Sequence, residues 1–305
     1  MVSKMDDLLK ELKCANIGRI LTEVSLANYT TYKVGGIAKV MVYPTNVEKL
    51  TYLIKMLKSY KVSYMVLGFG SNVLFSDKVY DGVIIKLDEF NDIKIEHNKI
   101  TAGAGASLMK VALMSVKRGL TGLEFATGIP GSIGGAIYMN AGAYKSDMGY
   151  VTSKVKVLTP DYRVITMVNR ELGFHYRTSF LKQNPGYICL EATINLKYGN
   201  RELIEEVVRE RRNRRLETQP LEFPSAGSVF RNPEGMFAGK LIEDLGYKGL
   251  SKGGAKISDK HANFIINYDH AKAQDIKDLI DFIKEEVKYK YNVDLKVEQE
   301  LKNWE

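Results

Sequence analysis

The sequence predicts an α+β protein whose helices and strands are joined by irregular, glycine-rich connections. Strand-like apolar runs alternate with amphipathic helical segments along the 305-residue chain. Four short segments between these elements concentrate glycine. Hydrophobic residues make up 45% and charged residues 26% of the chain, as in ordinary globular proteins. This length is enough for two or three compact units.

The first part of the chain predicts the order strand, helix, strand, glycine loop, strand. Strand-like runs at 39–43 and 63–67 flank a helix that Asn46 can cap. The apolar face of that helix is formed by Leu50, Leu53, Ile54 and Leu57. A strand at 100–104 and a helix over 107–118 follow. Residues 1–13 mix charges with leucines, which predicts a short amphipathic helix and not a signal peptide.

The second part of the chain is β-rich and then helical. Strand-like runs occupy 154–158, 164–168 and 187–196, and an arginine-rich helix covers 201–217. A loop-rich segment leads to a strand at 263–267. A final helix carries Ile276, Leu279, Ile280, Ile283 and Val287 on one face. A composition shift at 217–224 predicts a domain boundary.

The formal net charge of +8 raises the question of nucleic-acid binding. The densest basic run lies in 201–217, but that window holds six arginines and five glutamates and is nearly neutral. Aromatic residues of the kind that stack on bases are not interleaved with it. The pattern therefore predicts a solvated helix surface and no nucleic-acid partner.

The sequence also excludes several other classes of protein. No stretch approaches the roughly 20 apolar residues of a membrane span. The two cysteines, Cys14 and Cys189, have no metal or redox spacing, which indicates a reducing, cytoplasmic setting. The four histidines, at 97, 175, 261 and 270, have no ligand spacing either, so no catalytic metal is predicted.

The glycine-rich segments are 31–36, 68–72, 102–106 and 127–135. Glycine permits positive φ and lets amide N–H groups approach an anion closely, although turn formation alone explains any single segment. Gly103-x-Gly105 fails as a dinucleotide fingerprint because Leu108 stands where a small residue is required. Gly68-x-Gly70 lacks a following crossover helix. A Rossmann-type NAD dehydrogenase is therefore disfavoured.

Taken together, these loops resemble the FAD-binding half of the vanillyl-alcohol-oxidase type flavoproteins. More closely, the order of motifs resembles the UDP-N-acetylenolpyruvoylglucosamine reductase family. The matching pieces, in family order along nearly the whole chain, are NYTTYKVGG (28–36), LGFGSNVL (67–74), GLEFATGIPGSIGGA (122–136), YRTSF (176–180), PSAGSVFRNP (224–233), SDKHANF (258–264) and VEQE (297–300).

The resemblance implies a two-lobed FAD-binding domain of the vanillyl-alcohol-oxidase type plus a C-terminal α+β substrate-binding domain. The lobes are expected at 1–89 and 90–215, with 296–305 returning to the second lobe. The substrate domain is expected at 216–295. No room exists between 180 and 199 for the tyrosine-bearing loop of the family's longer subclass, so the chain resembles the shorter one.

The resemblance also implies the reaction, that of UDP-N-acetylmuramate dehydrogenase in peptidoglycan precursor synthesis. NADPH reduces FAD, and the reduced flavin passes hydride to the enolpyruvyl ether of a UDP-sugar, giving UDP-N-acetylmuramate. The protein would be a cytoplasmic monomer that serves cell-wall formation, cell shape and cell division. Another FAD-dependent oxidoreductase of the same superfamily, such as an alcohol oxidase, is the alternative.

Site residues follow from the motifs. Hydride addition builds enolate charge, which requires a cationic group at the carboxylate and a proton donor at the adjacent carbon. The resemblance assigns catalysis to Arg177, Ser228 and Glu298, and substrate contacts to Asn232 and His261; for His261 a satisfied structural histidine is an equal alternative. The cofactor-binding residues implied are Tyr32, Val34, Gly35, Gly36, Gly68, Gly70, Ser71, Asn72, Thr127, Gly128, Pro130, Gly131, Ser132, Gly134 and Gly135.

Two further expectations concern these residues. Neither histidine nor cysteine occurs in the loops at 31–36, 68–72 or 128–135, so FAD is expected to be bound non-covalently. The chain ends with ELKNWE where family members continue with an apolar strand and a glycine. We therefore expect a short terminal strand that holds Glu298 less rigidly.

Overall fold

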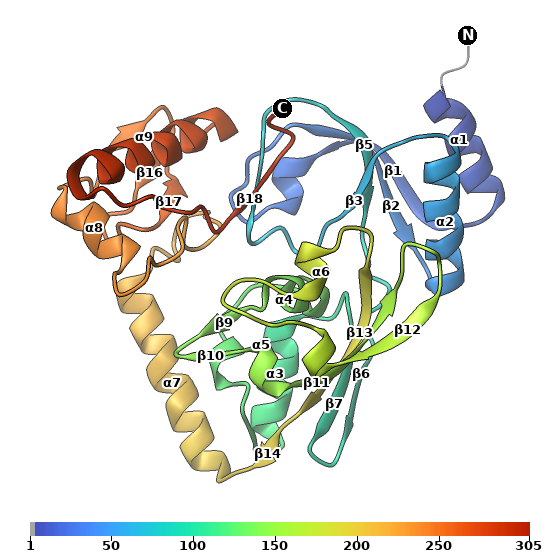
Figure 1. Cartoon of the computed structure of the whole chain (residues 1–305), viewed down its shortest axis with the longest axis horizontal. Coiled ribbons are helices and arrows are strands. Elements are labelled where there is room, and N and C mark those ends of the chain that lie inside the picture. Colours follow the sequence, from blue (N-terminus) through green and yellow to red (C-terminus); the bar gives the residue numbers. More distant parts are fainter. Residues whose placement is uncertain (1–3) are drawn as a thin grey trace. The chain divides into compact units, whose positions relative to one another are not determined.

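The computed structural model of the chain describes residues 4–305 and shows helices and strands mixed along the sequence (Figure 1). The helices are α1 (Lys4–Cys14), α2 (Val47–Ser59), α3 (Leu108–Lys117), α4 (Ile133–Met139), α5 (Met148–Val151), α6 (Phe180–Gln183), α7 (Arg201–Thr218), α8 (Ala238–Asp244) and α9 (Ala273–Tyr291). Short 3-10 turns cover Leu26–Tyr29, Glu124–Ala126 and Asn169–Glu171. The predicted N-terminal helix is confirmed from Lys4 onward, and its residues 1–3 lie outside the described part.

The strands form several small sheets and one larger one. They are β1 (Gly18–Ser25), β2 (Ile37–Pro44), β3 (Tyr64–Val66), β4 (Val73–Phe75), β5 (Tyr80–Ile85), β6 (Ile93–Glu96), β7 (Lys99–Gly103), β8 (Leu120–Thr121), β9 (Gly142–Ala143), β10 (Ser146–Asp147), β11 (Thr152–Leu158), β12 (Val164–Val168), β13 (Ile188–Asn195), β14 (Lys197–Tyr198), β15 (Ser251–Lys252), β16 (Ala255–Ile257), β17 (Ile265–Asn267) and β18 (Glu300–Lys302). The order predicted for the first 90 residues is confirmed.

Helices α2 and α9 begin where polar side chains cap them. The Asn46 side chain accepts a hydrogen bond from the Lys49 amide at 2.9 Å, as predicted, and the four apolar residues of the α2 face are buried. Helix α9 is capped by a distant residue, because the Asp77 carboxylate accepts from the amides of Ala273 and Gln274. The predicted apolar face of α9 is buried as well.

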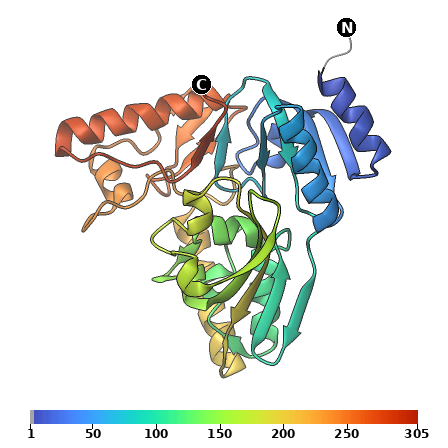
Figure 2. The same cartoon turned by 45° about the vertical axis from the view of Figure 1, so that its right-hand side comes forward.

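The structure divides into two compact units with separate apolar cores. Unit 1 comprises residues 4–22, 40–69 and 81–212. Its five-stranded antiparallel sheet has the order β12-β11-β13-β7-β6, and α4 packs against β13 and β7. Helices α1 and α2 lie side by side, as both views show (Figure 1 and Figure 2). The four-stranded sheet β1-β2-β5-β3 supplies much of the remaining core.

Unit 2 comprises residues 23–39, 70–80 and 213–305. Its three-stranded antiparallel sheet has the order β15-β16-β17, and α9 packs along it (Figure 1). The final strand β18 pairs in parallel with β4, matching Glu300 with Val73. The last strand was expected to return to residues 90–215, so the structure corrects that expectation: its partner lies at 73–75. The three lobe boundaries otherwise stay a prediction.

The short C-terminal tail is held firmly within unit 2. The Trp304 indole N–H donates to the Leu74 carbonyl at 3.0 Å, and the Ser76 amide donates to the Lys302 carbonyl at 3.0 Å. The Trp304 ring also packs on the apolar core of unit 2. These contacts tie the last residues to the segment around β4, and the expected lower rigidity of Glu298 stays a prediction.

Helix α7 confirms the predicted solvated surface, because Ile204 is its one buried residue among those described. Within residues 4–305 no helix combines the length and the apolar character needed to cross a bilayer. The same residues contain no group of three or more histidine, cysteine, aspartate or glutamate side chains that could hold a metal ion.

Candidate functional site

Ser228 and Glu298 lie on neighbouring backbone segments of unit 2. The Glu298 amide donates to the Val229 carbonyl at 2.8 Å, and Phe230 and Val297 form an isolated β-bridge. The Asn72 side chain donates to the Glu298 carbonyl at 3.3 Å. The structure therefore brings two of the three predicted catalytic residues close together in the chain's fold, and both are half-buried.

The segment after Ser228 is fixed by Asn263, which is buried. The Val229 amide donates to the Asn263 backbone carbonyl at 2.9 Å, and the Asn263 side chain exchanges two hydrogen bonds with the backbone of Phe230. A buried side-chain amide with this many partners fixes the local backbone. Ser228 is thus carried by a well-defined backbone rather than by a free loop.

Tyr32 and Val34 have buried side chains. Both residues are buried in the apolar core of unit 2, with Tyr32 fully enclosed. The Tyr32 hydroxyl donates to Gln299 Oε1 at 3.2 Å, and burial raises the pKa of its phenol. Contacts of Tyr32 and Val34 with FAD stay a prediction.

Arg177 lies in unit 1, at the tip of a tight turn. His175 and Thr178 close this turn with two reciprocal backbone hydrogen bonds of 3.1 Å. Arg177 has φ of +57°, in the left-handed region that non-glycine residues rarely adopt. Its Nη2 donates to the Gly142 carbonyl at 2.9 Å. Backbone strain of this kind persists only where the surroundings enforce it, and it concentrates at functional sites.

The surroundings that hold the Arg177 turn come from α4 and from the β9–β10 hairpin. The Asn140 side chain is buried; it donates to the His175 carbonyl and accepts from the Gly149 amide, both at 2.9 Å. The hairpin that offers the Gly142 carbonyl is held in turn at Tyr144, whose hydroxyl donates to the Arg211 carbonyl at 3.2 Å. The guanidinium of Arg177 is therefore anchored by buried and part-buried polar contacts within unit 1.

The loop at residues 68–72 has backbone amides that lack an acceptor within the described part of the chain. Within residues 4–305, the five amides from Gly68 to Asn72 donate to no acceptor. Gly70 has φ of +66°, and a Cβ there would lie 2.0 Å from the Tyr29 carbonyl oxygen. A Cβ on Gly68 would lie 2.7 Å from Ser132 Oγ. Successive free amides in a glycine loop form the kind of concavity that binds phosphate.

Several backbone amides of the loop at 127–135 already have acceptors within unit 1. The amides of Ile133 and Gly134 donate to the carbonyls of Ala106 and Ala104 at 2.9 and 2.8 Å. The Gly135 amide donates to Ser132 Oγ at 3.2 Å. The first turn of α4 is therefore bonded within unit 1, and Gly134 is small because a Cβ would press on Ala104. Contacts of 127–135 with a cofactor stay a prediction.

The glycines at 103 and 105 are structural, as the failed fingerprint indicated. A Cβ on Gly103 would lie 2.2 Å from the Phe90 carbonyl oxygen, and one on Gly105 would lie 2.0 Å from that of Leu87. Both glycines permit close approach of two backbones.

Lys86 is a candidate functional residue that the sequence did not reveal. It follows β5 directly, and its side chain is only 5% exposed. Its Nζ donates to the Gly68 carbonyl at 2.5 Å and lies 3.3 Å from Asp88 Oδ1. Burial lowers the pKa of Lys86, and Asp88 opposes that shift. The only signal available was a lysine standing between Ile85 and Leu87 in an apolar run.

The two predicted substrate residues of unit 2 have structural partners. Asn232 Oδ1 accepts from the Ala238 amide at 3.1 Å, at the start of α8. His261 Nδ1 accepts from the Asn263 amide at 3.2 Å, and its ring lies 4.9 Å from that of Phe264. Contacts of Asn232 and His261 with the substrate stay a prediction.

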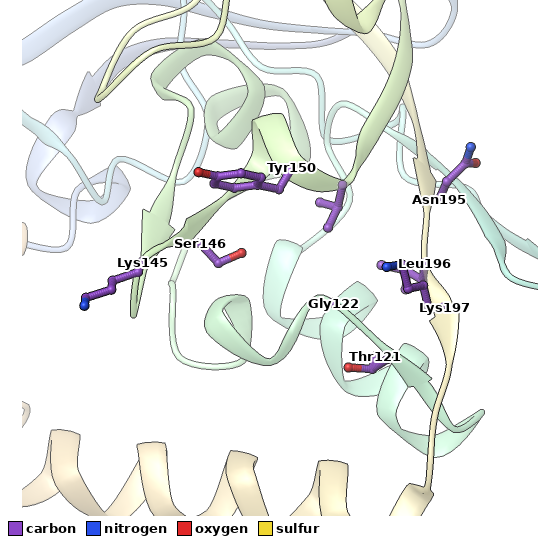
Figure 3. Close-up of a pocket in the computed structure, with 9 residues that line it drawn as sticks. Thr121, Gly122, Lys145, Ser146, Tyr150, Asn195, Leu196 and Lys197 are labelled. Atoms are coloured by element: carbon purple, nitrogen blue, oxygen red, sulfur yellow. The ribbon is translucent and has the colours of Figure 1, made fainter.

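A shallow pocket of about 360 Å³ lies elsewhere in unit 1 (Figure 3). Lys145 and Ser146 of the β9–β10 hairpin line it on one side, and Asn195, Leu196 and Lys197 line it on the other. None of the predicted site residues is among its lining residues, so the pocket is not assigned to the reaction.

Comparison with known proteins decides the family. Residues 219–302 match the profile described as UDP-N-acetylenolpyruvoylglucosamine reductase, C-terminal domain. UDP-N-acetylenolpyruvoylglucosamine reductase 1 of Bacillus thuringiensis subsp. konkukian is 45% identical over 97% of this chain and 99% of its own length. The chain belongs to the UDP-N-acetylenolpyruvoylglucosamine reductase family. The enzyme of that name from Bacillus subtilis is 43% identical over 97% of this chain and 98% of its own.

The fold of the family is shared as well. Residues 38–167 match the profile described as FAD binding domain. The crystal structure of UDP-N-acetylenolpyruvylglucosamine reductase from Thermus caldophilus superposes with a TM-score of 0.80 at 34% identity, covering 93% of this chain and 98% of that one. The predicted α+β class and FAD-binding fold are therefore confirmed, and the chain is a flavoprotein of this family.

Lys86 gives a prediction for this FAD-binding domain. Lys86→Met should weaken FAD binding to the apoprotein by roughly 10-fold or more, because a charge-assisted hydrogen bond to the Gly68 peptide is lost. Quenching of flavin fluorescence during titration measures the dissociation constant. Lys94→Met is the matched control, since Lys94 also pairs with a carboxylate two residues on but is 71% exposed. Equal affinity of Lys86→Met and wild type would contradict this role.

His261 gives a second prediction, on stability. Burial lowers the pKa of His261, and the positive charge of Lys248 adds to the shift. Because the folded state disfavours the imidazolium, the associated stability is fully present above the ordinary pKa of about 6.5 and is lost as the pH falls below it. The melting temperature should therefore fall more between pH 7 and pH 5 in wild type than in His261→Gln. Parallel curves for the two proteins would refute the assignment.

Proposed function

We propose that this chain is an FAD-dependent reductase that uses NADPH to convert UDP-N-acetyl-enolpyruvyl-glucosamine to UDP-N-acetylmuramate. The observation that carries the proposal is the match over 97% of the chain to relatives named UDP-N-acetylenolpyruvoylglucosamine reductase. The free amides of 68–72 support it, because a pyrophosphate requires several such donors in one place. The Lys86 ammonium adds fixed positive charge beside that loop.

The cofactor-binding part of the proposal rests on these residues. Gly68, Gly70, Ser71 and Asn72 would hold the FAD pyrophosphate through their amides, with the loop at 127–135 beside Gly68. When bound, FAD would take hydride from NADPH and deliver it to the methylene carbon of the enolpyruvyl ether. Cys189 is buried, with a thiol pKa raised to about 12 by burial, which makes it an inert thiol rather than a covalent tether.

The catalytic part of the proposal requires a cationic group at the substrate carboxylate and a proton donor at the adjacent carbon. Arg177 would hold the substrate carboxylate and stabilise the negative charge that develops on it. Ser228 would give its hydroxyl proton to the carbon that bears the ether oxygen, so that its O–H bond breaks as a C–H bond forms; water would restore the serine proton. Glu298, beside Ser228, would assist at the same carbon. Asn232 and His261 would contact the UDP-sugar.

The cellular part of the proposal follows from the product. UDP-N-acetylmuramate is a peptidoglycan precursor, so the enzyme would act as a cytoplasmic monomer in cell-wall formation. The proposal is tested by the colour and activity of the purified protein. We expect a yellow protein whose FAD is released by acid precipitation, and NADPH oxidation that requires the enolpyruvyl substrate. Colourless protein that FAD does not reconstitute, or substrate-independent NADPH oxidation alone, would refute it.

A further inference from the structure

Gln299 is a buried polar residue whose side chain has several hydrogen-bond partners. Only 4% of its surface is exposed. Its Nε2 lies 3.3 Å from the carbonyl oxygens of both Ala226 and Gly227. The same amide group lies beside the Tyr32 hydroxyl. The hydroxyl oxygen is 3.1 Å from Nε2 and 3.2 Å from Oε1. All of these residues belong to unit 2.

The two carbonyls fix the orientation of the Gln299 amide. Carbonyl oxygens only accept hydrogen bonds, so the NH₂ side must face Ala226 and Gly227. The Oε1 side then faces Tyr32, whose hydroxyl can donate to it. Tyr32 is fully buried. The pair is therefore a fixed donor aimed at the turn that precedes Ser228.

The turn depends on that donor. Gly227 has φ of +74° with open space around its Cα, so the left-handed conformation, and not crowding, requires glycine there. Within the described part of the chain, only Gln299 donates to the Ala226 and Gly227 carbonyls. The other side of Ser228 is held separately, by Asn263 and by the Glu298 amide. Gln299 thus provides the hydrogen bonds on the N-terminal side of Ser228.

We propose that Gln299 is a positioning residue that holds the Ala226–Gly227 turn so that the Ser228 hydroxyl faces its proton acceptor. This inference rests on the proposed function, since it gives Ser228 the proton-donor role. Gln299 touches no reacting atom; it acts through the backbone of the turn. A displacement of a catalytic group by about 1 Å can reduce a rate by about 10²-fold, so a modest change in the turn has a large effect.

The test uses the FAD-loaded enzyme and separates the two half-reactions. Gln299→Leu removes the donor while keeping a similar volume. We expect flavin bleaching by NADPH to proceed as in wild type, and recolouring by the enolpyruvyl substrate to slow by about 30- to 100-fold. Tyr32→Phe leaves the Gln299 amide able to reach both carbonyls, so recolouring should slow by only a few-fold. Gln299→Met, of similar length and without donors, replaces the leucine variant if that protein does not fold.

A double substitution shows whether Gln299 acts through Ser228. In the Ser228→Ala background the proton donor is already gone, so adding Gln299→Leu should slow recolouring no further. Additional slowing would show that Gln299 acts through another group, such as the adjacent Glu298, and would overturn the inference. If Gln299→Leu recolours at the wild-type rate while Ser228→Ala recolours slowly, the inference is also overturned, but the proposed function stays intact. Wild-type enzyme that the substrate does not recolour would instead refute the proposed function.

Discussion

Arg177→Ala should lower kcat for the enolpyruvyl substrate by ~10²–10³-fold, the usual cost of losing one group that stabilises a developing oxyanion. The turn that carries Arg177 is closed by backbone hydrogen bonds between His175 and Thr178, so the substitution should leave its backbone in place. Arg177→Lys should recover only part of the rate, because an ammonium cannot replace a planar guanidinium that also bonds the Gly142 carbonyl. Steady-state NADPH oxidation measures both variants.

Arg163→Ala is the matched control for this prediction. Arg163 also lies in unit 1 and pairs with Asp161, but its side chain is 73% exposed. Its removal should leave kcat unchanged, as expected for a surface ion pair. Wild-type turnover by both Arg177 variants would show that Arg177 only supports the turn and the β9–β10 hairpin.

Ser228→Ala should slow flavin recolouring by the enolpyruvyl substrate at least ~100-fold, since a positioned acid contributes ~10²–10⁴-fold. Flavin bleaching by NADPH should stay near normal, because hydride transfer to the flavin needs no proton donor at the substrate carbon. Alanine is nearly the size of serine, and the neighbouring backbone is held by Asn263, so the fold and the FAD content should survive. Anaerobic stopped-flow absorbance follows both phases.

Ser225→Ala, three residues earlier in the same segment, controls for general damage. It should leave both phases unchanged. Equal slowing of the two phases in Ser228→Ala would indicate a disturbed fold, and recolouring at the wild-type rate would remove Ser228 as the proton donor.

Local sequence patterns predicted the helices well where residues near in the sequence determine the structure. Asn46 caps α2, and the apolar faces of α2 and α9 are buried as their periodicity indicated. The near balance of arginine and glutamate in α7 correctly indicated a solvated helix. Gly70, in a predicted glycine-rich loop, adopts positive φ in the structure.

Contacts between distant segments were beyond these patterns. Tyr32 reads as part of a glycine-rich loop, yet its hydroxyl meets Gln299, which is 267 residues away. Lys86 reads as the end of a strand, and only the fold shows its ammonium on the Gly68 carbonyl. The amides of Ile133 and Gly134 at the start of α4 donate to the carbonyls of Ala106 and Ala104, which follow β7. No local pattern in the sequence indicated these acceptors. Pairing of this kind depends on topology rather than on local sequence.

The catalytic assignments illustrate the same division. The motifs around Arg177, Ser228 and Glu298 carried the resemblance, but only the structure shows which residues support them. Asn140 holds the Arg177 turn, Asn263 and Gln299 hold the Ser228 turn, and Asn72 and Val229 hold the backbone of Glu298. A functional group is often recognisable by type, whereas the residues that position it are recognisable only by contact.

A single anaerobic experiment tests the central claim most directly. The FAD-loaded protein is first bleached with one equivalent of NADPH, and UDP-N-acetyl-enolpyruvyl-glucosamine is then added in the absence of oxygen. We expect full bleaching, then recolouring with formation of one UDP-N-acetylmuramate per flavin. Flavin that NADPH does not bleach, or bleached flavin that stays colourless in the presence of the substrate, would contradict the proposed reaction.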